Sequence, residues 1–542
     1  MSGRFRNRFK VITHTSQEPA DRNIFVLTQE RVIEFDTLAQ VDFFVIDEFY
    51  KLDPTRDDNE RAALLNQAFY KLHKLSKRFY MLGPSIFGLP QEFQERVDCK
   101  FILDPYQTVI SEVHDVSAGE EDVKTLIDLC KTFDDSTSIF CRSPKRASDI
   151  AKALIEAGIG KESANLKPAA DWICDNYHPD WHFARAIRQG IGVHHGRIPR
   201  SLAQYAVRQF NSGELKFMVC TSTLIEGVNT KARNMVILDN EINRNPIDFF
   251  TFNNIRGRSG RMMQHFIGHV YIFKSPPQYE LPFVDVPAYT QSTDTPTSLL
   301  IQLDDEDLEP QAKERVKKYS EQDILSYEVL RKNSGIDLDI QLELAAEIHQ
   351  RIEYYHKNLY WTNIPDYKQL EFMCFVIWNH FGGHRLGGGS VRTAKQLAFL
   401  ISRLSRKPSA KELIIDKLKW EKDPDEAVQQ TLDFLRLWAT FHFPRLLRVV
   451  DIIQRDIFKR YELPTGNYES FGVLIENLFW DPAIIAIDEY GIPLEIARKI
   501  ESVISEDGNL DKTLAKLKVL AIENLDLTDF EKEIIKDSVS CL

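Results

Sequence analysis

The sequence predicts an α/β protein in which two parallel-sheet regions are followed by a mostly α-helical region. Three observations lead to this expectation. Short apolar runs alternate with helical spacing through the first half of the chain, a stretch rich in proline, serine, threonine and acidic residues interrupts the pattern, and strand signals are scarce beyond it. Alternating strands and helices favour a parallel sheet with helices on both faces. We therefore expect an α/β region over residues 1–116, a second over 117–280, a linker over 281–310 and helices over 311–542.

The composition narrows the class of protein. A chain of 542 residues is too long for one core and predicts several domains. With 68 Lys and Arg against 80 Asp and Glu, the formal net charge is −12, so a nucleic acid would have to bind through a local basic channel. No apolar run approaches the ~18 residues of a membrane span. Seven scattered cysteines without a CxxC pair fit a reducing cytosol and argue against a zinc or iron–sulfur site. We expect a cytoplasmic protein with no membrane partner.

The first region contains short apolar runs of the buried-strand type at Asn23–Leu27, Phe43–Asp47 and Phe79–Leu82, with helical spacing over Glu60–Lys77. The second of these runs ends in the acidic pair Asp47-Glu48. At the carboxyl end of a strand, such a pair can hold Mg²⁺ and orient a water against a phosphate. A strand that merely enters an acidic turn has the same pattern.

The second region repeats this rhythm. We expect strands at Ser138–Cys141, Phe217–Cys220, Met235–Leu238 and Gly268–Phe273, and a helix over Pro144–Glu156. These elements predict a second parallel sheet.

Thr221-Ser222-Thr223 directly follow one of these strands. Their hydroxyls and backbone N–H groups could hold a nucleic-acid phosphate. Gly227 and Asn229 come within the next turn and could contact a nucleotide.

Arg258 and Arg261 lie three residues apart among glycine and serine. This spacing suits a helix start pressed against negative charge, because guanidinium groups can grip phosphate oxygens two at a time. A solvated basic helix end is the alternative.

Two further segments are less specific. His194-His195 stand beside glycines, but no acidic or cysteine ligand lies at metal spacing, so a structural or strand-contacting role is favoured over a metal site. Residues 381–395 form a glycine-rich basic segment within the Lys- and Arg-rich stretch 385–422. Flexible backbone with cations suits phosphate contacts, and a mobile loop with a solvated helix explains it equally well.

Taken together and in this order, these residues resemble superfamily 2 helicases of the DEAD/DEAH-box type, in the superkiller-type branch. The matching segments are Asp47-Glu48 (motif II), Gly83-Pro84-Ser85 (a variant motif III), Phe140–Ser143 (motif IV), Gly190–Arg197 (the His-His-Gly signature), Thr221–Asn229 (motif V) and Asn254–Arg261 (motif VI). The resemblance implies two RecA-like lobes, the first incomplete, followed by a helical region that in this branch often holds a winged helix and a helical bundle.

The resemblance also implies ATP and Mg²⁺ as cofactors and a role for each motif. Asp47 would bind the metal, Glu48 would activate the attacking water, and Arg258 and Arg261 would be arginine fingers. The nucleotide would be contacted by Gly227, Asn229, Asn254 and Gly257. A single strand of DNA or RNA would be contacted by Arg142, Ser143, His195, Thr221, Ser222 and Thr223.

The sequence departs from the family pattern in three places. Phe49 is bulky where a small residue normally follows the acidic pair, so the local packing must differ. Asn254 replaces a longer glutamine. No Gly-x-x-x-x-Gly-Lys-Ser/Thr loop is present anywhere in the 542 residues, so the Walker A part of the first lobe is missing.

We therefore expect an ATP-dependent helicase or translocase in a truncated or split form that is inactive alone and has lost an N-terminal half. One alternative is a non-catalytic nucleic-acid-binding or scaffold subunit. Another is the helicase subunit of a bacterial defence or repair complex with a nuclease partner.

Overall fold

The computed structural model describes residues 8–35, 38, 40–55, 59–84, 86–104, 110–116, 121–225, 230, 232–242, 245–259 and 267–542. The chain divides into two compact units, and each is built from three separate segments. Unit 1 consists of Met1–Leu103, Pro282–Ser405 and Leu437–Phe479, and unit 2 consists of Asp104–Leu281, Arg406–Arg436 and Trp480–Leu542. The helical region predicted after residue 311 thus contributes segments to both units. Within the described residues, no helix has the length and apolarity needed to cross a membrane.

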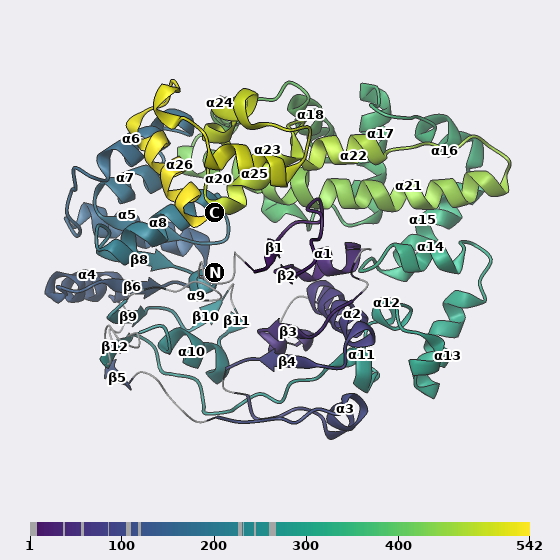
Figure 1. The fold of residues 1–542 in the computed structure, drawn as a ribbon, viewed down its shortest axis with the longest axis horizontal. Coiled ribbons are helices and arrows are strands. Elements are labelled where there is room, and N and C mark those ends of the chain that lie inside the picture. The colour runs from purple at the N-terminus through teal and green to yellow at the C-terminus, as the bar shows by residue number, and fades with distance from the viewer. Residues whose placement is uncertain are drawn as a thin grey trace. The chain divides into compact units, whose positions relative to one another are not determined.

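Unit 2 is organised around a six-stranded sheet in which all neighbouring strands are parallel. In spatial order the strands are β5 (Ile110–Asp115), β12 (Ile267–Ile272), β9 (Asn234–Ile237), β6 (Thr137–Phe140), β8 (Phe217–Cys220) and β7 (Ile191–His194). Figure 1 shows β8, β6, β9, β12 and β5 in this sequence across the sheet. The predicted parallel α/β fold is confirmed, and the four strands predicted here lie within one residue of their observed starts and ends.

Helices cover both faces of this sheet because successive strand residues point in opposite directions. Ile139 of β6 packs in one apolar cluster with α5 (Pro144–Glu156) and α8 (Arg200–Ser212). Its neighbour Phe140 packs on the opposite face, together with Ile255 of α10 (Phe249–Arg256).

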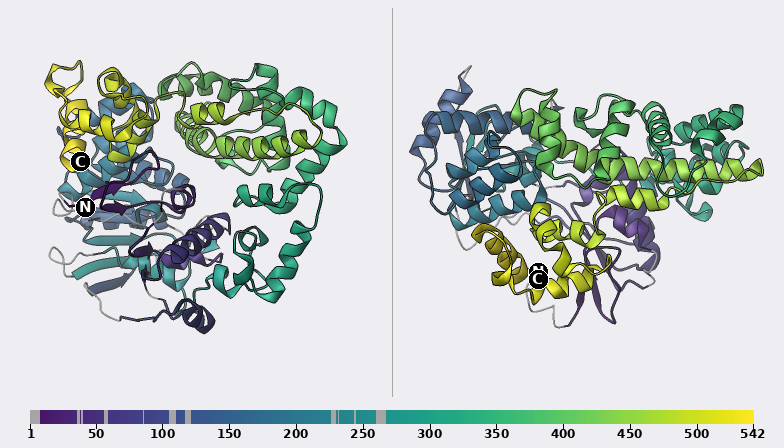
Figure 2. Two further views of the ribbon diagram at one scale, coloured as in Figure 1. Left: turned by 45° about the vertical axis from the view of Figure 1, so that its right-hand side comes forward. Right: turned by 90° about the horizontal axis from the view of Figure 1, so that it is seen from above.

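The last segment of the chain completes the first of these clusters. Phe530 of α26 (Asp529–Cys541) packs against Trp172 of α6 (Lys167–Asn176), with ring centroids 5.6 Å apart. The Trp172 indole N–H donates to the Glu531 carboxylate (2.8 Å), which is fully buried and also binds Lys499 (2.7 Å). The yellow C-terminal helices lie beside the blue helices of unit 2 in each view (Figures 1 and 2).

The remaining helices of unit 2 surround this core. They are α4 (Asp122–Thr132), α7 (His182–Arg188), α9 (Ser222–Ile225), α19 (Ala410–Leu418), α20 (Pro424–Asp433), α23 (Pro482–Ala486), α24 (Leu494–Ile504) and α25 (Leu510–Lys518).

Unit 1 contains two small parallel sheets. One pairs β1 (Lys10–Ile12) with β2 (Asn23–Phe25), and the other pairs β3 (Phe44–Asp47) with β4 (Phe79–Leu82). Phe69 of α2 (Asn59–Leu75) packs on the inner face of the β3–β4 pair, where it meets the rings of Phe44 and Phe79.

The other face of the β3–β4 pair is open. It carries the cross-strand neighbours Val45 and Tyr80 together with Leu82, which are 45%, 66% and 50% exposed. Exposed apolar patches of this kind mark a surface that a further element or partner can cover.

The stretch predicted as a linker, 281–310, is packed into unit 1. It holds two short α-helices and a 3-10 helix, and its Ala288 N–H donates to the buried amide oxygen of Asn66 (3.0 Å). The Tyr289 hydroxyl also meets His73 Nδ1 (2.6 Å). Both partners lie on α2, so this stretch is part of the core that supports β3 and β4.

The rest of unit 1 is helical. Its helices are α1 (Gln29–Glu34), α3 (Gln91–Val97), α11 (Pro287–Thr290), α12 (Thr297–Leu300), α13 (Pro310–Ser320), α14 (Tyr327–Lys332), α15 (Leu338–Gln350), α16 (Ile352–Leu359), α17 (Tyr367–His380), α18 (Ala394–Leu404), α21 (Phe443–Arg460) and α22 (Glu469–Glu476). Residues 311–542, whose backbone is described throughout, form helices and one isolated bridge between Thr362 and Asn467. The strand-built wing of a winged helix is not formed there.

Candidate functional site

Three strands of unit 2 end at the same level of the sheet. The Cys141 N–H donates to the Cys220 carbonyl (2.8 Å), and the Thr221 N–H donates to the His194 carbonyl (3.1 Å). The carboxyl ends of β6, β8 and β7 therefore lie side by side. The predicted nucleic-acid residues directly after these strands are Arg142, Ser143, Thr221, Ser222, Thr223 and His195, so the fold brings this whole set to one edge of the sheet.

The hydroxyl groups at this edge differ in exposure. Thr221 is buried and its hydroxyl meets that of Thr223 (3.3 Å), which is exposed. Gly196 lies against Thr223, because a Cβ on this glycine would stand 3.2 Å from the threonine methyl. Ser143 caps α5 by accepting from the Arg146 N–H (3.3 Å). Thr223 is thus the threonine whose hydroxyl a ligand can reach.

Arg142 is held by two acidic residues. Its N–H donates to Asp239 (2.9 Å), and its guanidinium group forms an ion pair with Glu241. The hydrogen bond to Glu241 raises the pKa of Arg142 above its ordinary value. A phosphate that approaches Arg142 would therefore compete with Glu241 for the guanidinium group.

His194 and His195 are buried rather than exposed to a ligand. Burial lowers the pKa of His194 to about 4 and that of His195 to about 3, and the positive charges of Arg197 and Arg436 add to the effect on His195. Nδ1 of His195 accepts from the Arg197 N–H (3.3 Å). Both rings are neutral at pH 7, so His195 offers no cation to a phosphate.

His195 also lines a cavity of about 160 Å³ within unit 2. The cavity is bounded by α5, the start of α7, the end of β7 and the start of α20. Within its lining, Asp425 forms an ion pair with Lys152 (2.9 Å) and contacts the His182 ring.

The buried histidines predict acid sensitivity. The folded-state pKa of His195 lies below its ordinary value of 6.5, so the unfolded chain binds a proton that the fold does not. The contribution of the neutral His195 ring to the free energy of unfolding is fully present above pH 6.5 and is lost as the pH falls toward 3. At pH 5 the loss is about 2 kcal/mol for one such histidine.

His195→Asn, which can still accept from the Arg197 N–H, should therefore lose less stability between pH 7 and pH 5 than the wild type. Denaturant unfolding of both proteins at the two pH values measures the difference. The other titrating groups are common to the two proteins, so the difference between their losses reports on residue 195. Equal losses in both would contradict the burial of a neutral ring.

The described part of the predicted motif VI lies at the end of a helix, and whether a helix starts beyond Ser259 concerns residues outside the described ones. Asp248 caps the start of α10 by accepting from Thr251 N–H (2.8 Å), and the helix ends at Arg256. Gly257 then follows as the C-cap, and the Arg258 N–H donates to the Ile255 carbonyl (3.1 Å). Glycine and serine are compatible with either helix end, so the local pattern does not distinguish the two.

The backbone beside Arg258 is anchored to the sheet. The buried Ser259 donates from its hydroxyl to the Arg256 carbonyl (2.8 Å) and meets the Ser111 hydroxyl of β5 (3.2 Å). Sequence reasoning missed this contact because the two serines are 148 positions apart. Asn254 lies on the last turn of α10, so Asn254, Gly257 and Arg258 are brought together. Arg261, Gly227 and Asn229 lie outside the described residues.

The acidic pair of unit 1 is arranged as a tight turn. Asp47 ends β3 with an exposed side chain, and its Oδ1 accepts from the Glu48 N–H (3.0 Å). Glu48 has a left-handed backbone (φ 55°), a conformation uncommon for residues other than glycine and enriched at functional sites. Its carboxylate pairs with Lys51 (3.0 Å). Asp47 and Glu48 belong to unit 1, whereas Arg258 belongs to unit 2.

The bulky Phe49 is explained by a glycine in the predicted motif III. Phe49 is buried, and a Cβ on Gly83 would stand 3.1 Å from its ring. The missing side chain at Gly83 thus makes room for Phe49. Ser85, the last residue of that motif, lies outside the described residues.

The glycine-rich segment packs against two stacked tryptophans in unit 1. The rings of Trp378 and Trp438 are 5.8 Å apart. A Cβ on Gly383 would stand 2.6 Å from Trp378, and one on Gly387, whose φ is +69°, would stand 2.0 Å from Trp438. Close packing therefore accounts for these two glycines. Arg392, just beyond them, is exposed.

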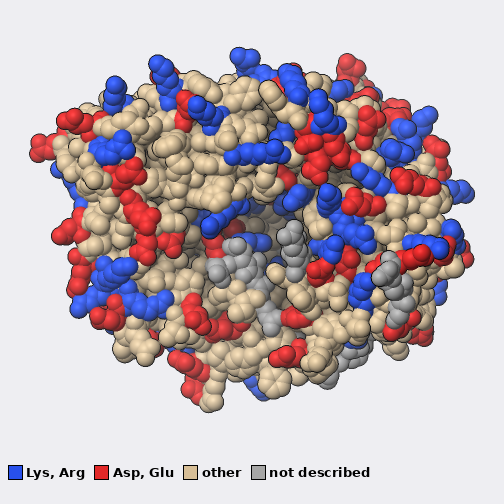
Figure 3. Space-filling view, turned by 180° about the vertical axis from the view of Figure 1, so that it is seen from behind, with Lys and Arg blue, Asp and Glu red and all other residues tan. Residues whose placement is uncertain are grey.

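Two groups of three candidate metal ligands occur among the described residues, and neither contains His194 or His195. They are Glu112, His114 and His269 in unit 2, and Asp304, Glu306 and Asp307 in unit 1. The acidic group binds the ammonium group of Lys74. On the face drawn in Figure 3, basic and acidic side chains are interspersed.

Comparisons with known proteins show similarity to helicases. Residues 175–263 match the Helicase conserved C-terminal domain. ATP-dependent DNA helicase Hel308 of Pyrococcus horikoshii is 23% identical over 278 residues, which cover 46% of this chain and 37% of that protein. A solved structure, S. cerevisiae Dbp5 bound to RNA and ADP BeF3, covers 52% of this chain and 71% of that chain at 14% identity, with a TM-score of 0.37. The chain is a superfamily 2 helicase-like protein.

A longer match extends over nearly the whole sequence. The chain is 31% identical to Anti-bacteriophage protein B of Escherichia coli (strain K12) over 538 residues. This match covers 94% of this chain and 73% of that protein. This chain therefore belongs to the family of Anti-bacteriophage protein B.

Proposed function

We propose that this chain is the nucleic-acid-binding body of a bacteriophage-defence helicase, a superfamily 2 translocase of the superkiller-type branch. The observation that carries the proposal is the edge of the unit 2 sheet. There, Arg142, Ser143 and the exposed Thr223 follow the carboxyl ends of adjacent parallel strands. Parallel α/β sheets bind ligands at this edge, where side chains and backbone N–H groups from several strands converge. The name of the E. coli relative supports a role against bacteriophage.

ATP and Mg²⁺ are the cofactors that the family implies. The residues present fit the Mg²⁺ ion and the γ-phosphate end of ATP. The Asp47 carboxylate is exposed at a strand end and has about four acceptor sites, of which the Glu48 N–H occupies one. Asp47 would hold the metal ion, Glu48 would orient water, and Arg258 would face the γ-phosphate. The loop that cradles the β- and γ-phosphates is absent from these 542 residues, so we propose that a partner or a further segment supplies it.

The alternative is a non-catalytic nucleic-acid-binding or scaffold subunit, acting within a defence complex that includes a nuclease. The absence of Gly-x-x-x-x-Gly-Lys-Ser/Thr favours it. Both forms would work in a reducing cytoplasm, which agrees with the six described cysteines all being free thiols. Both forms also bind a single strand, so strand binding is the first property to measure.

We expect weak binding of a single-stranded oligonucleotide with strong salt dependence. Counterion release lowers log K by about 0.7 per phosphate contacted for each tenfold rise in salt. Thr223→Ala should weaken binding about equally at every salt concentration, because its hydroxyl is uncharged. Arg392→Ala should flatten the slope by about 0.7 if the glycine-rich segment contacts a phosphate. Fluorescence anisotropy from low to moderate salt measures both quantities.

Lys518→Ala is the matched control. Lys518 is an exposed cation on α25, and its loss changes the net charge as much as the loss of Arg392. The control should leave the slope unchanged. No binding at low salt, or equal effects of the two charge variants, would contradict the proposed strand contacts.

A further inference from the structure

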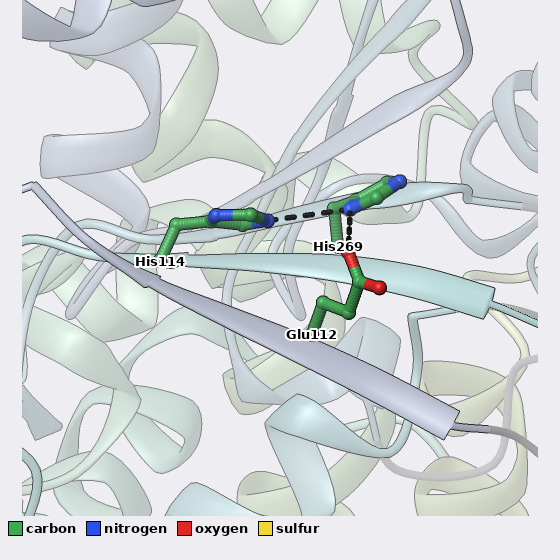
Figure 4. A group of neighbouring side chains, drawn as sticks. All are labelled: Glu112, His114 and His269. Atoms are coloured by element: carbon green, nitrogen blue, oxygen red, sulfur yellow. Dashed lines mark hydrogen bonds and ion pairs between the residues drawn. The ribbon is translucent and has the colours of Figure 1, made fainter.

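Two histidines and a glutamate gather on one face of the unit 2 sheet, away from the candidate strand-binding edge. Glu112 and His114 lie two residues apart on β5, and His269 of β12 is directly opposite Glu112. Since residues two apart on a strand share a face, all three side chains project from the same face. Figure 4 shows them pointing toward one another.

Their donor atoms have the spacing of metal ligands. Nε2 of His114 lies 3.3 Å from Nδ1 of His269, and this Nδ1 lies 3.4 Å from Oε2 of Glu112. All three atoms are within 4.8 Å of one another. Ligands about 2.0–2.2 Å from a tetrahedral Zn²⁺ are separated by about 3.3–3.6 Å.

Hydrogen bonding alone does not satisfy this arrangement well. A neutral imidazole nitrogen either donates one hydrogen or accepts one. Nδ1 of His269 faces both a carboxylate oxygen and a second imidazole nitrogen. Either one proton is shared between the two contacts, or one contact sets two lone pairs against each other. A cation placed among the three atoms would accept a lone pair from each.

The surroundings hold the cluster in place and leave it open to solvent. Tyr271, opposite His114 in the register, stacks on its ring at 4.8 Å, and Phe133 in turn packs on Tyr271 at 4.9 Å. The side chains of Glu112 and His269 remain 53% and 25% exposed. An ion can therefore enter from water.

We propose that Glu112, His114 and His269 bind a divalent transition metal ion of the Zn²⁺ class, with the fourth position open to water. Imidazole and carboxylate are both zinc ligands, and three protein ligands plus water complete a tetrahedral site. The scattered cysteines led to the expectation of no zinc site, but they bear only on thiolate ligands and not on imidazole and carboxylate.

The metal would fasten the edge of the sheet. β5 is the edge strand, and its neighbour in the sheet is β12. Two ligands come from β5 and one from β12, so the ion would cross-link the pair. Ser111 of β5 also meets Ser259 beside Arg258 (3.2 Å), so the same strand supports the predicted motif VI. The site itself requires no nucleotide or nucleic acid.

The test measures Zn²⁺ bound to the 542-residue protein after equilibrium dialysis. The wild type should hold one more equivalent than His269→Ala or Glu112→Gln, and its melting temperature should rise with Zn²⁺ concentration, since an ion that binds the folded state stabilises it. His178→Ala is the matched control. His178 is a unit 2 histidine 4.0 Å from Asp180 and outside any described three-ligand cluster, so this variant should bind as the wild type does.

Co²⁺ provides a second readout. The wild type should show the visible absorption of tetrahedral Co²⁺ without a thiolate charge-transfer band, because no sulfur is among the ligands. Glu112→Gln keeps a similar shape and a hydrogen-bond acceptor, so it preserves the fold while removing the charged ligand. Equal metal content in the wild type and Glu112→Gln, or a thiolate band that His269→Ala leaves intact, would overturn the site.

Discussion

Replacing Arg258 with alanine is expected to lower ATP turnover about 10³–10⁵-fold in a form of the protein that also carries a phosphate-binding loop, with little change in strand binding. An arginine finger acts on charge that develops in the transition state. A positioned role is expected, because the Arg258 N–H donates to the Ile255 carbonyl and the next residue, the buried Ser259, donates from its hydroxyl to the Arg256 carbonyl. Arg258→Lys should not restore turnover, since a point charge does not reproduce the planar guanidinium group.

Arg256→Ala is the matched control for this experiment. Arg256 is two residues away on the same helix end, and its guanidinium group already donates to the Asn253 side chain (2.6 Å). We expect a change of only a few-fold in turnover, measured as phosphate release under single-turnover conditions. Near-normal turnover in Arg258→Ala would show that this side chain is a solvated helix end, which was the alternative from the sequence.

The second large effect concerns the 542 residues by themselves, which are expected not to hydrolyse ATP even with Mg²⁺ and nucleic acid. Phosphoryl transfer depends on positioning and charge neutralisation. Asp47, Glu48 and Arg258 would supply the metal site, the water and a finger. Nothing in the sequence supplies the lysine and the backbone N–H groups of a Walker A loop.

Phosphate release with and without a single strand tests this expectation. Glu48→Gln is the informative variant, because it removes the carboxylate that would activate water and retains the side-chain shape. Turnover by the wild-type chain that disappears in Glu48→Gln would contradict the expectation and would reveal a phosphate-binding element of another kind. Activity that appears only when a chain with such a loop is added would support assembly from parts.

Three of the four strands predicted in unit 2, β6, β8 and β9, were predictable because they are short, fully buried apolar runs. Phe217–Cys220 was predicted with its observed bounds, and the residues after it were placed correctly at a strand end. The sequence did not show whether a helix starts or ends beside Arg258, since Gly257 and Ser259 fit a helix start as well as a helix end. The burial of His195 was also hidden, because it depends on helices that pack from other parts of the chain.

Contacts between distant positions account for the rest. Glu112 and His269 meet through strand register, and a sequence read locally does not show which strands are neighbours. The same holds for Phe49, whose place depends on the missing side chain of Gly83. Ala288 and Tyr289, which contact α2, were also not recognised as core residues, because the stretch 281–310 has a composition typical of linkers.

The interleaving of the two units has a consequence for synthesis on the ribosome. The lobe that begins at Asp104 depends on Phe530 and Glu531 of α26 to cover Trp172, so its core is completed only when α26 emerges from the ribosome. At about 5–20 residues per second, the nascent chain after Leu281 would wait roughly 10–50 s with that apolar surface uncovered. A truncation that removes α26 would thus act as a lesion of the lobe that begins at Asp104, and nascent chains would be clients for chaperones until α26 has been made.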